Sequence, residues 1–273
     1  MTLRTDGSGE HPTSWERPSA FADRRLKYAI YAAILAFIAW SAWEMLPSLS
    51  RLAGGLSIAA DVVADMFPPN YGPRERGLIW SGVVETIVIA NVATVLGILV
   101  SLPIAFMAAE NIAPRPVYYV GRGIISVSRA FHELVIAIIA VVAVGFGPLA
   151  GVIALVFNTV GFYAKLLAEE IEDMDWGQVE AVQATGASSL QVFLYAVIPQ
   201  VMPRIVGLSV YRWDINLRKS TIIGIVGAGG IGFTLVRSFE VYEYAFTMAI
   251  LIVIIAIVFA GEGISALVRR RVK

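Results

Sequence analysis

Long runs of apolar residues constrain this chain more than any other feature of its sequence. A helix needs about 20 apolar residues to cross a hydrocarbon layer about 30 Å thick. Six runs have roughly this length: 28–46, 78–107, 124–146, 148–168, 191–211 and 244–267. Inside lipid every backbone N–H and C=O must be paired within the protein, which favours helices. We therefore predict an all-α membrane protein with about six transmembrane helices.

Composition supports this class and excludes others. Hydrophobic residues make up 58% of the chain and charged residues 15%, against about 25% charged residues in an average soluble domain. The net charge is zero, so no basic field points to nucleic acid. The chain has no cysteine, and its two histidines, His11 and His132, are far apart. We therefore expect no disulfide, no thiolate chemistry and no metal site.

Basic residues near the two ends indicate the orientation. Arg24, Arg25 and Lys27 precede the first apolar run, and RRRVK ends the chain. Lys and Arg flank the cytosolic ends of membrane helices, so we predict both termini in the cytosol, which requires an even number of spans. Residues 1–27 are predicted to form a disordered cytosolic tail. Residues 28–77 would hold the first span and an extracytoplasmic loop with a surface helix, 78–268 the core, and 269–273 a basic cytosolic C-terminus.

A polar stretch, EAVQATGASSLQVFLYAVIP at 180–199, separates two of the apolar runs. Ala, Glu and Gln favour a helix, Gly186 ends it, and Ser188 and Ser189 can cap the next helix. Alternate counting of the spans places this stretch in the cytosol. We predict a short cytosolic helix at about 175–188, a turn at Gly186 and a helix entering the membrane. An ordinary loop between two spans is the alternative.

The same stretch resembles a motif of the permease subunits of binding-protein-dependent ABC importers. That motif reads EAA, three residues, Gly, nine residues, then I-x-L-P. Glu180, Ala181, Gly186 and Pro199 stand at this spacing. Three apolar positions depart from it: Val182, Ala196 and Ile198.

A second stretch of sequence resembles one particular branch of this permease family. NLRKSTIIGIVGAGGIG at 216–232 is similar to a run typical of the phosphonate branch of these permeases, N-x-R-x-S-T followed by G-x-V-G-A-G-G-I-G. His132 stands where relatives more often have proline before Glu-Leu. The run also contains G-x-G-x-x-G, but a dinucleotide site would need a soluble βαβ unit around it, which the flanking spans exclude.

The resemblance implies a type I ABC importer permease fold in a bacterial inner membrane. It implies a homodimer working with two cytosolic ATPase subunits and an extracytoplasmic binding protein. ATP and Mg would bind to the ATPase, with no cofactor in this chain. The substrate would be phosphonate, phosphite or phosphate. The short helix would dock on the ATPase and couple it to transport through Glu180, Ala181, Gln183, Thr185 and Gly186.

Polar residues within the apolar runs are candidates for a translocation pathway, since an ionisable residue inside a membrane is a functional hypothesis by default. Glycines permit close approach of the backbone, although helix packing explains them about equally well. The candidates are Arg129, Asn158, Asn216, Arg218, Ser220, Thr221, Gly227, Gly229 and Gly230. Arg129 and Glu133, four residues apart, are more simply read as an ion pair on one helix face.

Other readings of the sequence remain open. An ABC importer permease for another small solute fits the same motifs. A secondary transporter working alone would move its substrate without ATP and usually shows an internal repeat, which is not evident. An intramembrane enzyme would need a convergent set of carboxylates or histidines, and Glu85, Glu133 and His132 do not supply one. We therefore expect a transport subunit and not an enzyme.

Overall fold

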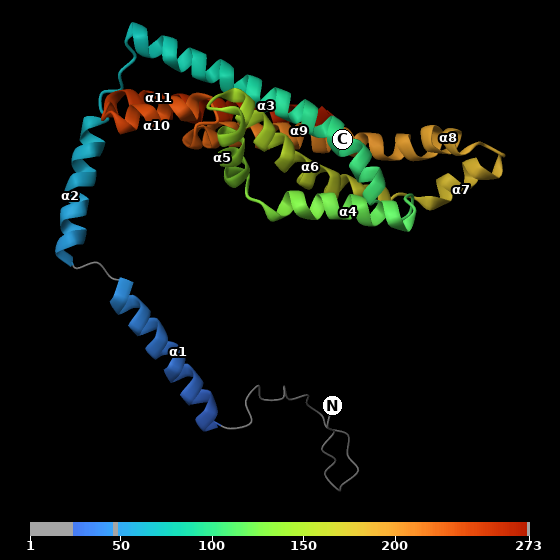
Figure 1. Ribbon diagram of the computed structural model, residues 1–273, viewed down its shortest axis with the longest axis horizontal. Coiled ribbons are helices and arrows are strands. Elements are labelled where there is room, and N and C mark those ends of the chain that lie inside the picture. Colours follow the sequence, from blue (N-terminus) through green and yellow to red (C-terminus); the bar gives the residue numbers. More distant parts are fainter. Residues whose placement is uncertain (1–23, 46–48, 272–273) are drawn as a thin grey trace. The chain divides into compact units, whose positions relative to one another are not determined.

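The computed structural model of the protein describes residues 24–45 and 49–271, and the described chain is built of helices and turns (Figure 1). Most of the predicted tail lies outside the described residues. The described helices are α1 (Arg24–Met45), α2 (Leu49–Asp65), α3 (Pro73–Ala108), α4 (Arg115–Ala130), α5 (Glu133–Val144), α6 (Pro148–Glu172), α7 (Trp176–Ala184), α8 (Ser189–Val192), α9 (Ile198–Ile222), α10 (Ile231–Glu240) and α11 (Tyr244–Arg271). A π-helical turn (Phe193–Val197) joins α8 to α9, and a 3₁₀ turn (Ile223–Val226) follows α9. By contacts, the chain divides into two units between Ala60 and Asp61.

Five helical segments are long and apolar enough to cross a membrane, and a bent pair raises the number to six. The five are α1, α3, α6, the segment from α8 to α10, and α11. The bent pair is α4 and α5, whose axes meet at 88°. The prediction of an all-α membrane protein with about six spans is confirmed.

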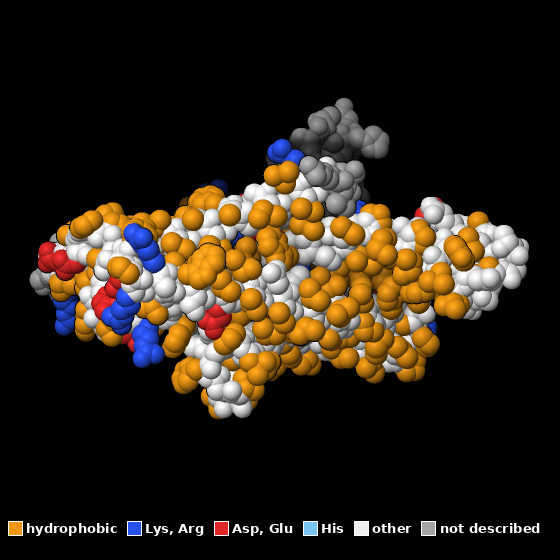
Figure 2. Space-filling model, turned by 90° about the horizontal axis from the view of Figure 1, so that it is seen from above, with side chains coloured by type: hydrophobic (Ala, Val, Ile, Leu, Met, Phe, Trp, Pro, Cys, Tyr) orange, Lys and Arg blue, Asp and Glu red, His pale blue; other side chains and the backbone are white. Residues whose placement is uncertain are grey.

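Small residues hold the core of the larger unit together. Helix α3 packs mainly on α6 and also on α9, and its buried face carries residues such as Gly82, Ala90, Ala93 and Gly97. Several of its bulky residues, among them Val95 and Leu99, are exposed instead, although Ile79 and Ile89 are buried. Hydrophobic side chains cover much of the face seen in Figure 2, where charged side chains gather toward one end. Small residues inside and bulky apolar residues outside are the pattern of helices that pack within lipid.

The predicted span at 124–146 is broken in the middle. Phe131 and His132 both have extended backbones, with ψ of 136° and 143°. The His132 Nδ1 then accepts a hydrogen bond from the Leu134 backbone N–H at 3.3 Å, which caps the new helix. A histidine in the cap position thus starts α5 in a new direction, and the predicted span is a bent pair of helices.

Helix α9 is longer than the sequence predicted. The apolar run predicted to form this span ends at Tyr211, but the helix continues to Ile222. Arg212, Asp214 and Asn216 are consequently buried on a helix. Arg212 and Asn216 find partners on neighbouring helices, and Asp214 pairs with Arg218 of its own helix, so the helix does not have to end where the charges begin.

Candidate functional sites: a short helix pair and a buried polar cluster

The first candidate site is the turn between α7 and α8. The Asp175 carboxylate caps α7 by accepting a hydrogen bond from the Gly177 N–H at 3.0 Å. Gly186 ends the segment with a φ of 80°, a left-handed conformation that glycine adopts freely. Ser188 and Gln191 then form a reciprocal capping box at the start of α8. The structure thus has a helix, a turn at Gly186 and a second helix.

One face of α7 packs against the rest of the protein, and the other face is exposed. Val179 is 1% exposed and packs with Val192 and Val197 from the following helices. Phe193 meets Phe106 of α3 edge to face, with ring centroids 5.1 Å apart. The five residues predicted to dock on an ATPase are all exposed: Glu180, Ala181, Gln183, Thr185 and Gly186. The arrangement offers a small, rigidly held polar surface; its docking role stays a prediction.

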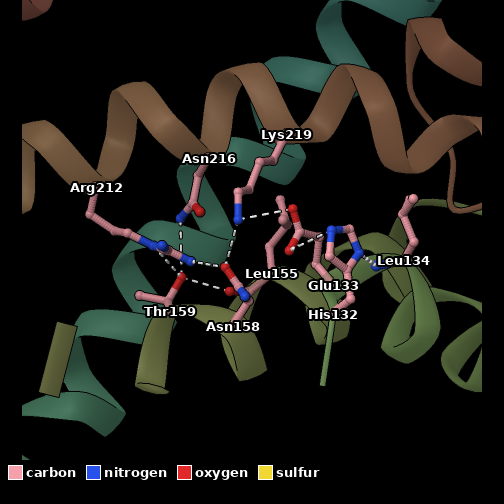
Figure 3. Close-up of polar contacts among 9 residues, drawn as sticks. All are labelled: His132, Glu133, Leu134, Leu155, Asn158, Thr159, Arg212, Asn216 and Lys219. Carbon is pink, nitrogen blue, oxygen red and sulfur yellow. Dashed lines mark hydrogen bonds and ion pairs between the residues drawn. The ribbon is translucent and has the colours of Figure 1, made fainter. Parts of the chain in front are cut away.

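The second candidate site is a polar cluster between α6 and α9 (Figure 3). Arg212, Asn216 and Lys219 follow one another at helical spacing along one face of α9. The Arg212 Nη2 donates to the Asn158 Oδ1 at 2.8 Å, and the Lys219 Nζ donates to the same oxygen at 3.0 Å. Two cations of α9 therefore share one amide oxygen of α6.

Two threonines complete the cluster from within. The Thr159 Oγ1 accepts from the Arg212 Nε at 3.0 Å and from the Asn216 Nδ2 at 3.2 Å. The Thr94 Oγ1 accepts from the same Asn216 Nδ2 at 2.9 Å. Each hydroxyl donates to a carbonyl of its own helix, Thr159 to that of Leu155. The orientation of the Asn216 amide is thereby set, and its buried Oδ1 has no partner among the described residues.

Glu133 is the acid of the cluster. Its Oε1 lies 2.9 Å from the Lys219 Nζ, and its Oε2 lies 3.9 Å from the His132 Nε2. Arg212 is only 1% exposed, and among the described side chains its hydrogen bonds reach neutral oxygens only. With two cations against one carboxylate, the cluster carries an excess positive charge.

Of the predicted pathway residues, Asn158 and Asn216 belong to this polar cluster. Ser220 and Thr221 are buried and donate to carbonyls of their own helix. Arg218 pairs with Asp214 at 2.7 Å, and its side chain is 47% exposed. Arg129 is exposed on α4. The predicted pair of Arg129 with Glu133 is wrong, because the helix break separates them and Glu133 pairs with Lys219.

The predicted glycines form a tight turn before α10. Gly227, Gly229 and Gly230 all have positive φ, between 76° and 85°. A Cβ at Gly230 would lie 2.8 Å from the Thr86 Oγ1, and the same hydroxyl accepts the Ile231 N–H at 2.8 Å. Conformation and close packing therefore require glycine here, whichever further role the turn has.

Three members of the cluster escaped the sequence reasoning: Arg212, Thr94 and Thr159. Arg212 lies just beyond the apolar run that ends at Tyr211, so the sequence did not place it within a span. A usable signal existed, since positions 212, 216 and 219 lie on one face if the helix continues. Among residues 24–45 and 49–271, no group of three or more His, Cys, Asp or Glu side chains could hold a metal ion.

Comparisons with known proteins place the chain among transport proteins. Residues 101–273 match the family described as binding-protein-dependent transport system inner membrane component. The phosphite transport system permease protein PtxC of Stutzerimonas stutzeri is 40% identical over 82% of this chain and 81% of that protein. The phosphate-import permease protein PhnE of Mycolicibacterium smegmatis is 42% identical over 76% of this chain, which covers 39% of that protein.

Solved structures show the same fold. An inward-facing MetNI methionine ABC transporter superposes with a TM-score of 0.65 at 20% identity, over 74% of this chain and 100% of that chain. An amino acid ABC transporter superposes with a TM-score of 0.61 at 23% identity, over 72% of this chain and 95% of that chain. At these identities the likeness concerns the fold, the permease fold of ABC importers.

Proposed function

The chain belongs to the family of binding-protein-dependent transport system inner membrane components, and we propose that it carries a phosphorus oxyanion, phosphonate, phosphite or phosphate, across a bacterial inner membrane. The observation that supports an anionic substrate is the excess positive charge of the cluster, in which Arg212 and Lys219 face a single carboxylate, that of Glu133. An uncompensated cation inside a membrane protein is costly, and an anion in transit would neutralise it. The names of the phosphite and phosphate permeases among the relatives support the same class.

We propose that the chain does no covalent chemistry and that separate subunits supply the energy and the ligand. Two cytosolic ATPases would bind ATP and Mg and dock on the exposed surface of α7, at Glu180, Ala181 and Gly186. An extracytoplasmic binding protein would deliver the oxyanion. A second copy of this chain would complete the pathway, since one copy offers at most six spans. Both termini would then lie in the cytosol.

The pathway itself is proposed to include Asn158 and Asn216 together with the polar end of α9. Arg218, Ser220 and Thr221 belong to this end, and the turn at Gly227, Gly229 and Gly230 follows it. Arg129, exposed on α4, remains a candidate for the entrance or exit. The interior charges of such a site must be few, so that the anion binds and still leaves.

Reconstitution tests the proposal directly. The chain is purified with its proposed ATPase and binding protein and placed in proteoliposomes. Uptake of radiolabelled phosphite, methylphosphonate, phosphate and methionine is then measured with and without ATP. We expect ATP-dependent uptake of at least one phosphorus oxyanion and none of methionine. Uptake without the ATPase would instead indicate a secondary transporter, and uptake of methionine alone would indicate a different solute.

A further inference from the structure

The ion pair of Lys219 and Glu133 is the accessible edge of the polar cluster. The Lys219 side chain is 25% exposed and that of Glu133 17%, whereas Arg212 is 1% exposed. In Figure 3 the two side chains reach toward each other from α9 and from the start of α5. An anion approaching the cluster therefore meets Lys219 before it meets Arg212.

The positions of these side chains suit an exchange of partners. The Lys219 Nζ is held from one side by the Asn158 Oδ1 at 3.0 Å and from the other by the Glu133 Oε1 at 2.9 Å. Loss of Glu133 would leave the ammonium group in place, hydrogen-bonded to Asn158 beside Arg212. The cluster would then present two cations and no acid, which is a site for an oxyanion.

Glu133 lies at the bend between α4 and α5, beside a second polar partner. It is the first residue of α5, directly after the 88° bend between α4 and α5. Its other carboxylate oxygen already lies 3.9 Å from the His132 Nε2, and the His132 side chain is 65% exposed. A carboxylate released from Lys219 thus keeps one polar neighbour at the bend, the His132 imidazole.

We propose that Glu133 is the resting counter-ion of Lys219 and that the transported oxyanion replaces it. In the empty protein the carboxylate neutralises Lys219 and keeps the cluster intact. In the loaded protein the anion occupies that place, bound by Lys219 with Arg212 behind it, and Glu133 turns toward His132. This inference rests on the proposed function and adds to it the group that a substrate must displace.

The two partners of a purely structural ion pair are equally important, but those of a displaceable pair are not. Lys219→Met removes a charge-assisted contact to the anion, which corresponds to a loss of at least about tenfold in affinity. Glu133→Gln removes the competing carboxylate and should tighten anion binding several-fold. Glu169→Gln and Lys165→Met break a comparable pair on α6, 3.3 Å long and outside the cluster, and should leave binding unchanged.

The test is direct binding of sodium phosphite to the purified permease and ATPase complex, without binding protein. Thermal unfolding is followed across a phosphite titration, with sodium chloride keeping the ionic strength constant. We expect a lower apparent Kd in Glu133→Gln and a Kd raised tenfold or more in Lys219→Met. Equal losses in both variants, recovered in the double variant Glu133→Gln/Lys219→Met, would show a structural pair and overturn the proposal.

Uptake in proteoliposomes separates this inference from the proposed function. Wild-type uptake of a phosphorus oxyanion with equal losses in the two single variants would overturn the counter-ion exchange alone. Tighter phosphite binding in Glu133→Gln, with no oxyanion uptake by the wild type, would overturn the proposed function and support the exchange. Unchanged phosphite binding in both variants would contradict the exchange, whatever the uptake.

Discussion

Arg212 Nε lies 3.0 Å from the Oγ1 of Thr159, so a buried cation of α9 is held by a hydroxyl of α6. The same oxygen accepts the Asn216 amide and donates to the Leu155 carbonyl, so every bond it can form is used. Thr94 receives only one donor from the cluster, the Asn216 amide. The two threonines look alike in sequence but differ in what depends on them.

Thr159→Val should destabilise the protein more than Thr94→Val. Valine keeps the shape of threonine, so the effect comes from donors left without an acceptor. Hydrogen bonds to charged groups contribute about 1.5–3 kcal/mol and neutral ones about 0.5–1.5 kcal/mol. Thermal unfolding of the purified protein measures the difference. Equal effects of the two substitutions would show that Arg212 does not depend on Thr159.

Gly97→Ala should loosen the contact between α3 and α6. A Cβ at this position would lie 2.5 Å from the Thr159 Cγ2, and overpacking of this kind costs about 1–3 kcal/mol. Gly77→Ala is the matched control, because it lies in the same helix with nothing within 4 Å. It should be neutral or slightly stabilising, since alanine favours helix. Similar melting temperatures for both variants would contradict the close packing.

Gly186→Val should impair ATP-dependent uptake while the protein still inserts into the membrane. The φ of 80° is strained for valine, by about 1–2 kcal/mol, and the turn between α7 and α8 would shift. A Cβ at this position meets nothing within 4 Å, so space is not the obstacle. Asparagine tolerates this conformation, so Gly186→Asn is the control for backbone geometry.

The two Gly186 variants also separate the two reasons for a glycine. If geometry alone matters, Gly186→Asn transports normally. If a partner must approach closely, the asparagine variant loses uptake and ATPase binding although its melting temperature is unchanged. Normal uptake in Gly186→Val would contradict a coupling role for this turn.

Local chemistry explains why the turn at Gly186 could be read from the sequence. Gly186 and Ser188 act on their own neighbours, through a positive φ and a capping box. Each apolar run likewise predicts a span from its own length and hydrophobicity, without reference to distant residues. The resemblance to the permease family then predicted how these elements are arranged, and that fold is confirmed.

The polar cluster depends on residues that are distant in the sequence. Thr94 and Thr159 bond to their own helices, as isolated threonines commonly do, and nothing local indicates that Asn216 reaches both. Arg212 looked like the start of a loop because charges usually end a span. The helix can continue there because hydrogen-bond partners on α3 and α6 offset the cost of burying its polar groups. A hydropathy pattern does not predict such contacts between helices.

The length of α3 gives a test of the topology. Its 36 residues extend about 54 Å at 1.5 Å per residue, more than the hydrocarbon thickness of about 30 Å. Arg74 lies in its first turn. Phe106 lies near its other end and packs on Phe193, next to α7. Arg74 and Thr185 should therefore lie on opposite sides of the membrane.

Single cysteines measure this cleanly, because the chain has no cysteine of its own. We expect Thr185→Cys to react with a membrane-impermeant maleimide only after the cytosolic side is opened, and Arg74→Cys to react from outside in intact cells. Both positions are exposed on this chain, so in the permease expressed without its ATPase, access depends on the side of the membrane and not on burial. The reverse labelling would invert the predicted orientation and move α7 away from a cytosolic ATPase. Labelling of both residues from the same side would show that α3 does not cross the membrane.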